Sequence, residues 1–265
     1  MLEWIGIFLN WLVAGLLFPL LFIPLARLVA HKSNSQFFIW LILVLGSVTL
    51  ASFFLISLPE KGYAPFRPAL GIWALSVVIV GALINLFGGF EKWGHQLSEL
   101  TNKLTRSTAR TVMWLVIVMA LVQFSIVILR YVFGVNSIWM QESITYMHGA
   151  VFLLAAGYAL ITDDHVRVDV FYRESSERRK AIINLFGTYT MLIPVCLLLL
   201  WTAAPYVFSS WQSVEGSNET SGLPLLFLLK SLIPAFAILL LLAAYHTAYQ
   251  NVDKLLIAKQ KKRTF

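Results

Sequence analysis

Charge and cysteine are both scarce in this chain, and each scarcity narrows what the protein can be. Only 12% of the residues are charged, about half the share found in an ordinary soluble domain. This low charge argues against a water-soluble globular protein. The single cysteine, Cys196, lies inside an apolar run, so an internal disulfide and a thiolate metal cluster are both excluded. We expect Cys196 to be a small packed residue.

Long apolar runs take the place of charge. Hydrophobic residues make up 59% of the chain, and several runs reach the roughly 20 residues with which a helix crosses a bilayer. The runs are continuous, unlike the short alternating segments of a membrane β-barrel. The first run opens with Glu3 and is too long for a cleaved signal, so we expect a true span. We predict an all-α, polytopic membrane helix bundle with seven transmembrane helices, at residues 2–30, 37–58, 68–87, 111–132, 138–161, 181–204 and 223–245.

The basic residues predict how the chain is oriented. The net charge is +7, but the basic residues sit in loops beside the spans, where they set orientation and meet anionic lipid rather than nucleic acid. With the C-terminus inside, sixteen of the 20 Lys and Arg residues lie on the inner side. The outer side then holds only Lys61, Arg67, Arg130 and Lys230. We predict N-terminus out, C-terminus in, and anionic lipid as a partner at the inner surface.

One segment between the spans is amphipathic. Its apolar residues recur every three or four positions and form one stripe: Phe90, Trp93, Leu97, Leu100 and Leu104. This spacing predicts an interfacial helix lying on the inner membrane surface, and the alternative is a plain cytoplasmic connector helix. The expected order of parts is a three-span extension at 1–89, the amphipathic helix at 90–110, a four-span unit at 111–250 and a basic cytoplasmic tail at 251–265.

Polar residues inside the predicted spans are few. A carrier or pump needs ionisable or strongly polar groups near the membrane centre, and the interior ones here are only Asn85, Gln123, His148 and Asn184. The chain is therefore poorly equipped to move a solute by itself, which favours an accessory role. We expect His148 to be a packed, hydrogen-bonded histidine rather than a metal ligand.

A second group of residues lies around the predicted fifth span. Trp139, Glu142 and Tyr146 share one helix face, and a carboxylate about one turn into a span needs a partner. We expect Glu142 to pair with Arg130 and join the two spans; the alternative is a contact with another subunit. The small residues Ala155 and Ala159 predict close helix packing further along the same span.

The charged segment 163–169 resembles a metal site only superficially. Its spacing fits no closed zinc pattern, and no cysteine is near. We expect His165, Arg167 and Asp169 to fix the shape of an inner loop, and we predict no catalytic, cofactor-binding or metal-binding residue.

Three blocks in a fixed order carry a family resemblance. The first is Arg130–Phe133 with Ser137 and Trp139. The second is Glu142 with Tyr146 and the small-residue stretch 152–159, and the third is the segment 165–171 followed by Arg178 and Arg179. Over residues 97–256 the chain resembles the small permease subunit, of DctQ type, of the tripartite ATP-independent periplasmic (TRAP) transporters. It departs from that pattern at Gln141, where such subunits often carry an acidic residue, and in its three extra N-terminal spans.

This resemblance implies a role and partners. In TRAP systems a periplasmic binding protein delivers a substrate, usually an organic acid, and a large many-span permease moves it with sodium. The small subunit braces that permease in the bacterial inner membrane, is not an enzyme and binds no cofactor. We expect the outer loops 134–138 and 205–222 to touch the binding protein. The alternatives are a seven-helix retinal-type photoreceptor with Lys230 in its last span, an accessory protein of another transporter, and an intramembrane enzyme.

Overall fold

The computed structural model of the chain describes residues 18–33, 43–44, 89–165 and 172–261, and every regular element in these ranges is a helix. The predicted all-α fold is therefore confirmed for this part of the chain. The span expected at 68–87, all but residues 43–44 of that at 37–58, and most of that at 2–30 lie outside the described residues. The helices are α2 (Phe18–Leu21), α3 (Ile23–Ser33), α6 (Gly89–Tyr131), α7 (Ile138–Thr162), α8 (Glu177–Gly187), the π-helical turn η3 (Thr188–Leu192), α9 (Ile193–Gln212) and α10 (Leu226–Lys261).

Four helical segments of the described chain are long and apolar enough to cross a membrane. Each contains all or nearly all of one span predicted between residues 111 and 250, so a polytopic helical membrane protein is confirmed. The seven-helix count and the orientation of the termini stay predictions. The four segments are Glu91–Tyr131, Ile138–Thr162, Glu177–Gln212 and Leu226–Ala258.

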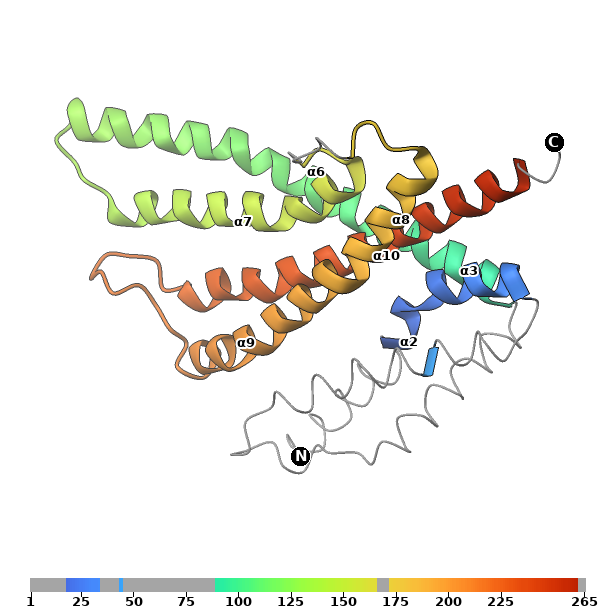
Figure 1. Ribbon diagram of the computed structural model, residues 1–265. Coiled ribbons are helices and arrows are strands. Elements are labelled where there is room, and N and C mark those ends of the chain that lie inside the picture. Colours follow the sequence, from blue (N-terminus) through green and yellow to red (C-terminus); the bar gives the residue numbers. More distant parts are fainter. Residues whose placement is uncertain (1–17, 34–42, 45–88, 166–171, 262–265) are drawn as a thin grey trace. The chain divides into compact units, whose positions relative to one another are not determined.

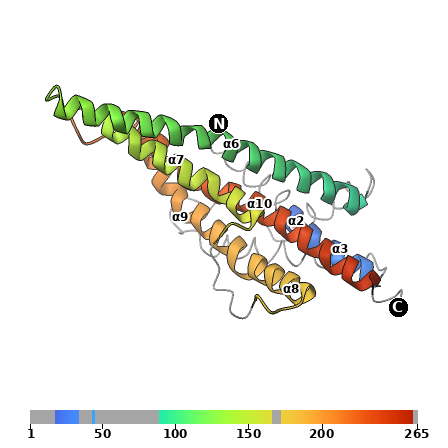
Figure 2. The same cartoon turned by 90° about the horizontal axis from the view of Figure 1, so that it is seen from above.

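The chain divides into two compact units. The first comprises residues 1–98, 174–185 and 248–265, and the second comprises 99–173 and 186–247. In the second unit α7 runs back along α6, and α10 runs back along α9 (Figures 1 and 2).

Helix α7 packs closely on its neighbours at two glycines. A Cβ at Gly157 would lie 2.9 Å from the backbone oxygen of Leu239 on α10 and 3.1 Å from Cγ2 of Thr105 on α6. Gly149 comes near Leu229 of α10 in the same way. Small residues allow such approaches between membrane helices. The close packing expected at Ala155 and Ala159 stays a prediction.

Helix α6 corrects one expectation. The amphipathic segment and the following span form a single helix of 43 residues, about 65 Å long, or about twice the apolar thickness of a bilayer. In its amphipathic part the buried residues include Ser98, Thr101 and Thr105, and the Thr105 hydroxyl donates to the Thr101 carbonyl at 2.8 Å. Further along the helix Val112 and Ile126 are buried. Leu100 and Leu104 of the expected apolar stripe are exposed. How this stripe lies against the membrane stays a prediction.

Two backbone features shape the other helices. Pro194 has no N–H and its ring would crowd the preceding helical turn; the turn before it widens into η3, in which Ile193 donates its N–H to the Thr188 carbonyl. Asp163 ends α7 in the left-handed conformation with φ 64°, and its N–H donates to the Ala159 carbonyl. Aspartate tolerates this conformation better than most residues.

Candidate functional site

Polar side chains gather where the loop 213–225 joins α9 to α10, at the same end of the second unit as the turn between α6 and α7 (Figure 1). Glu142, about one turn into α7, faces this loop. Its carboxylate accepts a hydrogen bond from the Ser217 hydroxyl and one from the backbone N–H of Leu223, at 2.6 Å. The carboxylate therefore fixes two points of the loop that lie far from it in the sequence.

The expected ion pair between Arg130 and Glu142 is wrong for the described structure. No ion pair joins them among the described residues, and both carboxylate oxygens of Glu142 have other donors. Arg130 is exposed in the last turn of α6. The physical reason is that neutral loop donors satisfy the carboxylate, while a guanidinium at a helix end can remain in water.

Gly222 allows the loop to approach Glu142. A Cβ there would lie 2.5 Å from the Ser217 Cβ and 2.8 Å from the Glu142 carboxylate. Both distances are shorter than carbon atoms can tolerate, so any side chain at this position would displace Ser217 or Glu142. The loop also carries its own turn bonds, from Ser217 N–H to the Leu223 carbonyl and from Gly222 N–H to the Glu219 carbonyl, each at 3.0 Å.

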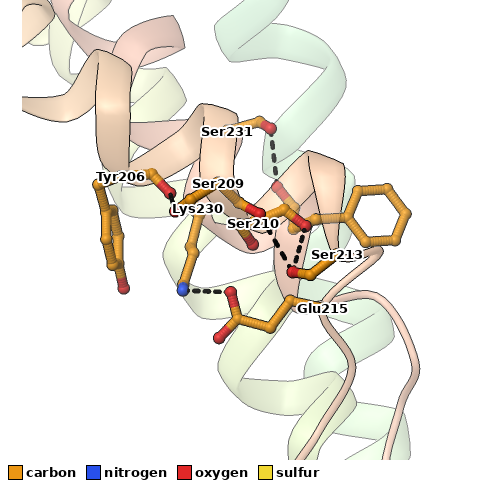
Figure 3. A network of polar contacts seen from close by, with 8 residues as sticks. Tyr206, Ser209, Ser210, Ser213, Glu215, Lys230 and Ser231 are labelled. Carbon is orange, nitrogen blue, oxygen red and sulfur yellow. Dashed lines mark hydrogen bonds and ion pairs between the residues drawn. The ribbon is translucent and has the colours of Figure 1, made fainter.

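Lys230 and Glu215 form a second anchor for the same loop (Figure 3). Lys230 lies in the second turn of α10, and its Nζ donates to the Glu215 carboxylate while lying 4.1 Å from the ring centroid of Tyr206 on α9. The lysine ammonium holds the pKa of Glu215 below its usual value, because a nearby positive charge favours the ionised carboxylate. This cluster ties the loop to α9 and α10 together.

Serine hydroxyl groups cap the last turn of α9 with hydrogen bonds to backbone carbonyls. Ser209 donates to the Tyr206 carbonyl at 3.0 Å and Ser213 donates to the Ser209 carbonyl at 3.1 Å, which satisfies acceptors that a helix end leaves open. Trp211 donates its indole N–H to the Ser231 hydroxyl of α10 at 2.8 Å. The two serine bonds lie within the end of α9 (Figure 3), and the Trp211–Ser231 bond joins that end to α10.

Of the remaining sequence-predicted site residues, Tyr146 lies near Glu142, whereas Trp139 and His165 have no recorded contact with this region among the described residues. Trp139 is exposed at the start of α7 and Tyr146 is half-buried one turn beyond Glu142. His165 is exposed in the segment after α7, and Arg167 and Asp169 lie outside the described residues. The structural or interface role expected for this set stays a prediction.

His148 also differs from the expectation. It is exposed on α7, and its recorded contact is stacking on Phe152 of the same helix, with ring centroids 6.5 Å apart. It is not the packed, hydrogen-bonded histidine that the sequence predicted, because the stripe of α7 on which it lies faces away from the other helices of this unit.

A separate polar cluster lies in the first unit. Arg27 of α3 forms ion pairs with Asp253 of α10 and with Glu91 of α6, the latter at 3.0 Å. Its guanidinium also lies 4.7 Å from the ring centroid of Tyr249. Only 16% of the Arg27 side chain is exposed. One arginine thus joins the N-terminal segment to two helices of the later chain.

Sequence reasoning missed Ser217, Gly222, Lys230 and Arg27 as site residues. One signal was present: Lys230 and the loop 205–222, which contains Glu215, were both assigned to the outer side, so these opposite charges could have been paired. No comparable signal marked Ser217 or Gly222, because a serine and a glycine in a loop fit almost any surface.

Comparison with known families decides the class of this chain. A family model described as "Tripartite ATP-independent periplasmic transporters, DctQ component" matches residues 119–254, which is 136 of 265 residues, or just over half. The chain belongs to the DctQ family. The match starts within α6 and runs through Glu142, the 213–225 loop and most of α10. Neither the comparison with curated proteins nor that with solved structures gave a match.

Membership in the DctQ family makes this a small membrane subunit of a TRAP transporter, and the family consists of transporter components rather than enzymes. This family membership does not favour the photoreceptor alternative. The lysine on which that alternative depended, Lys230, forms an ion pair with Glu215 near the start of α10.

Proposed function

We propose that this DctQ chain is a passive brace for the large permease of its transporter. In this proposal a periplasmic binding protein delivers an organic acid, the large permease moves it with sodium across the bacterial inner membrane, and the present chain holds the permease scaffold in place. The family match supports a role within such an assembly. The bracing role rests on how the chain uses its charged side chains.

The observation that carries the bracing role is the use of Glu142 and Lys230. Each charged group lies near one end of an apolar helix, where an ion or solute site could have been built. Each instead fastens the chain's own loop: Glu142 holds Ser217 and Leu223, and Lys230 holds Glu215. Charges used this way favour a fixed shape, and a fixed shape is what a brace needs.

The loop 213–225 is the proposed contact for the binding protein. Glu215 is already paired with Lys230, so it is a weak candidate for an outside partner. Glu219 is exposed at the loop and is therefore the better one. Reversing Glu219 to lysine should reduce delivery from the binding protein, while Glu99→Lys, an exposed change on α6, should leave it unchanged. Equal delivery in both variants would remove this loop from the proposal.

Anionic lipid is the proposed partner of the basic part of α6. Lys92, Lys103 and Arg110 are all exposed on this helix, and basic side chains beside a span attract anionic headgroups. Replacing all three with glutamine should lower the amount of anionic lipid that co-purifies with the chain. An unchanged lipid content would contradict this part of the proposal.

Two linked experiments test the brace. A tagged chain is purified from its native membranes in mild detergent, and a stoichiometric, very hydrophobic partner of many spans is expected. The chain alone and the chain with that partner are then placed in liposomes, each with the binding protein and a sodium gradient. Only the second preparation should accumulate solute. Accumulation by the chain alone would overturn the proposal.

A further inference from the structure

The exposed side of α7 is unusually polar for a membrane helix. Apart from Trp139 at the start of the helix, the exposed residues of α7 are Gln141, Thr145, His148 and Phe152. Their spacing of four, three and four residues places them within an arc of about 60° around the helix. We call these four residues the α7 stripe. Three of its four members are polar, although α7 as a whole is strongly apolar.

The α7 stripe reaches the middle of the membrane. Helix α7 has 25 residues, so it is about 37 Å long, and His148 lies about 15 Å from its first residue. Thr145 lies one turn nearer that end. Lipid tails offer no hydrogen bonds at this depth, and polar side chains there normally face protein.

Nothing in the described chain covers the stripe. Gly157, on the opposite side of α7, lies close to α10 and α6, and Glu142, about 90° around the helix from the stripe, bonds the 213–225 loop. Gln141 bonds the side chain of Asn136 at 2.6 Å, but within the described residues the structure records no hydrogen-bond partner for Thr145 or His148. The stripe therefore points away from the packed core of its unit with two polar side chains unsatisfied.

Small residues extend the same side of the helix. Ala155 and Ala159 continue the stripe toward the end of α7 by the same helical spacing. A pair of small residues four apart lets another helix come close. This side of α7 thus combines hydrogen-bonding side chains near the middle of the helix with small side chains toward its C-terminal end. Lipid tails cannot hydrogen-bond these side chains, whereas a neighbouring helix can both bond them and pack closely on the small residues.

We propose that the α7 stripe is the seat for one transmembrane helix of the large permease, which supplies a hydrogen-bonding side chain opposite His148 and Thr145. This inference rests on the proposed function and says which surface makes the contact. The occupant is a permease helix rather than a second copy of this chain, because the family is one component of a multi-component transporter and α7 needs a polar partner at mid-depth rather than lipid.

Photo-cross-linking in native membranes tests the surface directly. The photoreactive residue p-benzoylphenylalanine is placed singly at Phe152 or His148 in the full chain, next to the rest of the transporter. Met191 and Phe208, which are exposed by 66% and 59% on η3 and α9, serve as matched control positions. We expect ultraviolet light to join the stripe positions to the large permease and the control positions to give at least tenfold less of that product.

A second variant measures whether the polar groups matter. Thr145→Val together with His148→Leu keeps the stripe's size but removes its hydrogen bonds, and it should lower the recovery of the permease with the tagged chain about tenfold. Phe208→Leu should leave recovery unchanged. A cross-link from the stripe to a second copy of this chain, or to lipid only, overturns the inference while wild-type co-purification of the permease still supports the proposed function. Failure of the wild-type chain to co-purify any permease overturns the proposed function itself.

Discussion

The two polar clusters of this chain are built in different ways. At the 213–225 loop, Glu142 is satisfied by a hydroxyl and a backbone N–H, and a separate Lys230–Glu215 pair lies beside it. In the first unit a single arginine, Arg27, carries two ion pairs. The first cluster shapes one loop. In the second, Arg27 binds Glu91 and Asp253, which lie 64 and 226 residues from it in the sequence.

The difference indicates how much stability a substitution in each cluster should cost. The loop cluster depends on close fit, because its donors and acceptors meet only when Gly222 lets the chain approach. The arginine cluster depends on charge, and the Glu91 side chain in it is 80% exposed. A closely packed contact is destabilised most when atoms are added to it. Removing an exposed ion pair lowers the stability little. The four changes below test that contrast.

The largest effect is expected for Gly222→Ala. The added methyl group would meet the Ser217 Cβ at 2.5 Å and the Glu142 carboxylate at 2.8 Å, so the loop must shift, at a cost of about 1–3 kcal/mol for overpacking. Thermal unfolding of the detergent-solubilised chain measures it. Gly187→Ala is the matched control, because a Cβ at Gly187 meets nothing within 4 Å. Equal unfolding temperatures for the two variants would mean that the loop does not close on Glu142.

The next effect is expected for Glu142→Gln. An amide group cannot accept from both Ser217 and the Leu223 N–H as the carboxylate does, so the unfolding temperature should fall. Arg130→Gln should leave it unchanged, because Arg130 has no ion pair with Glu142 in the described structure. A similar fall in both variants, cancelled when the two charges are exchanged, would restore the pairing that the sequence suggested.

A smaller loss is expected for Arg27→Gln. Its partners are partly or mostly exposed, which limits the loss of unfolding free energy to about 1 kcal/mol. A double-mutant cycle with Asp253→Asn isolates the pair. Lys254→Gln, an exposed change next to Asp253, is the control. A coupling energy of zero between Arg27 and Asp253 would show that the N-terminal segment is held by other contacts.

The smallest effect is a pH dependence at Glu215. Lys230 lowers the pKa of this carboxylate in the folded chain, so the pair's contribution is complete above the ordinary carboxylate pKa and is lost as the pH falls through the lowered value. Between about pH 7 and pH 3, wild-type protein should lose slightly more thermal stability than Glu215→Gln. Identical losses would show that the ion pair contributes nothing.

Periodicity and length predicted the four-span part of the fold well. The span expected at 138–161 matches α7, Ile138–Thr162, almost residue for residue, because a long apolar run leaves the backbone no alternative to a helix. The amphipathic segment and the next span were expected as separate parts, whereas they form one continuous helix, α6. Every residue between Gly89 and Gly134 tolerates a helix, and amphipathic patterning says which side is apolar rather than where a helix ends.

The candidate site was predicted less well than the fold. Glu142 was singled out correctly as a charge that needs a partner, but its partner was assigned by closeness in sequence. The observed partners, Ser217 and Leu223, are 75 and 81 residues away. Contacts of that range are set by how α7 packs on α10, and a single sequence holds no direct record of it.

The pairing of Glu215 with Lys230 leaves the 213–225 loop with little outward charge. Glu215 is neutralised by its lysine, and Glu142 faces inward to the loop backbone, so Glu219 is the remaining acidic side chain on the loop's outer side. One surface charge is screened within about 8 Å at physiological salt. A soluble partner arriving at this loop would therefore find it by collision rather than by long-range attraction, and its association rate there would depend little on ionic strength.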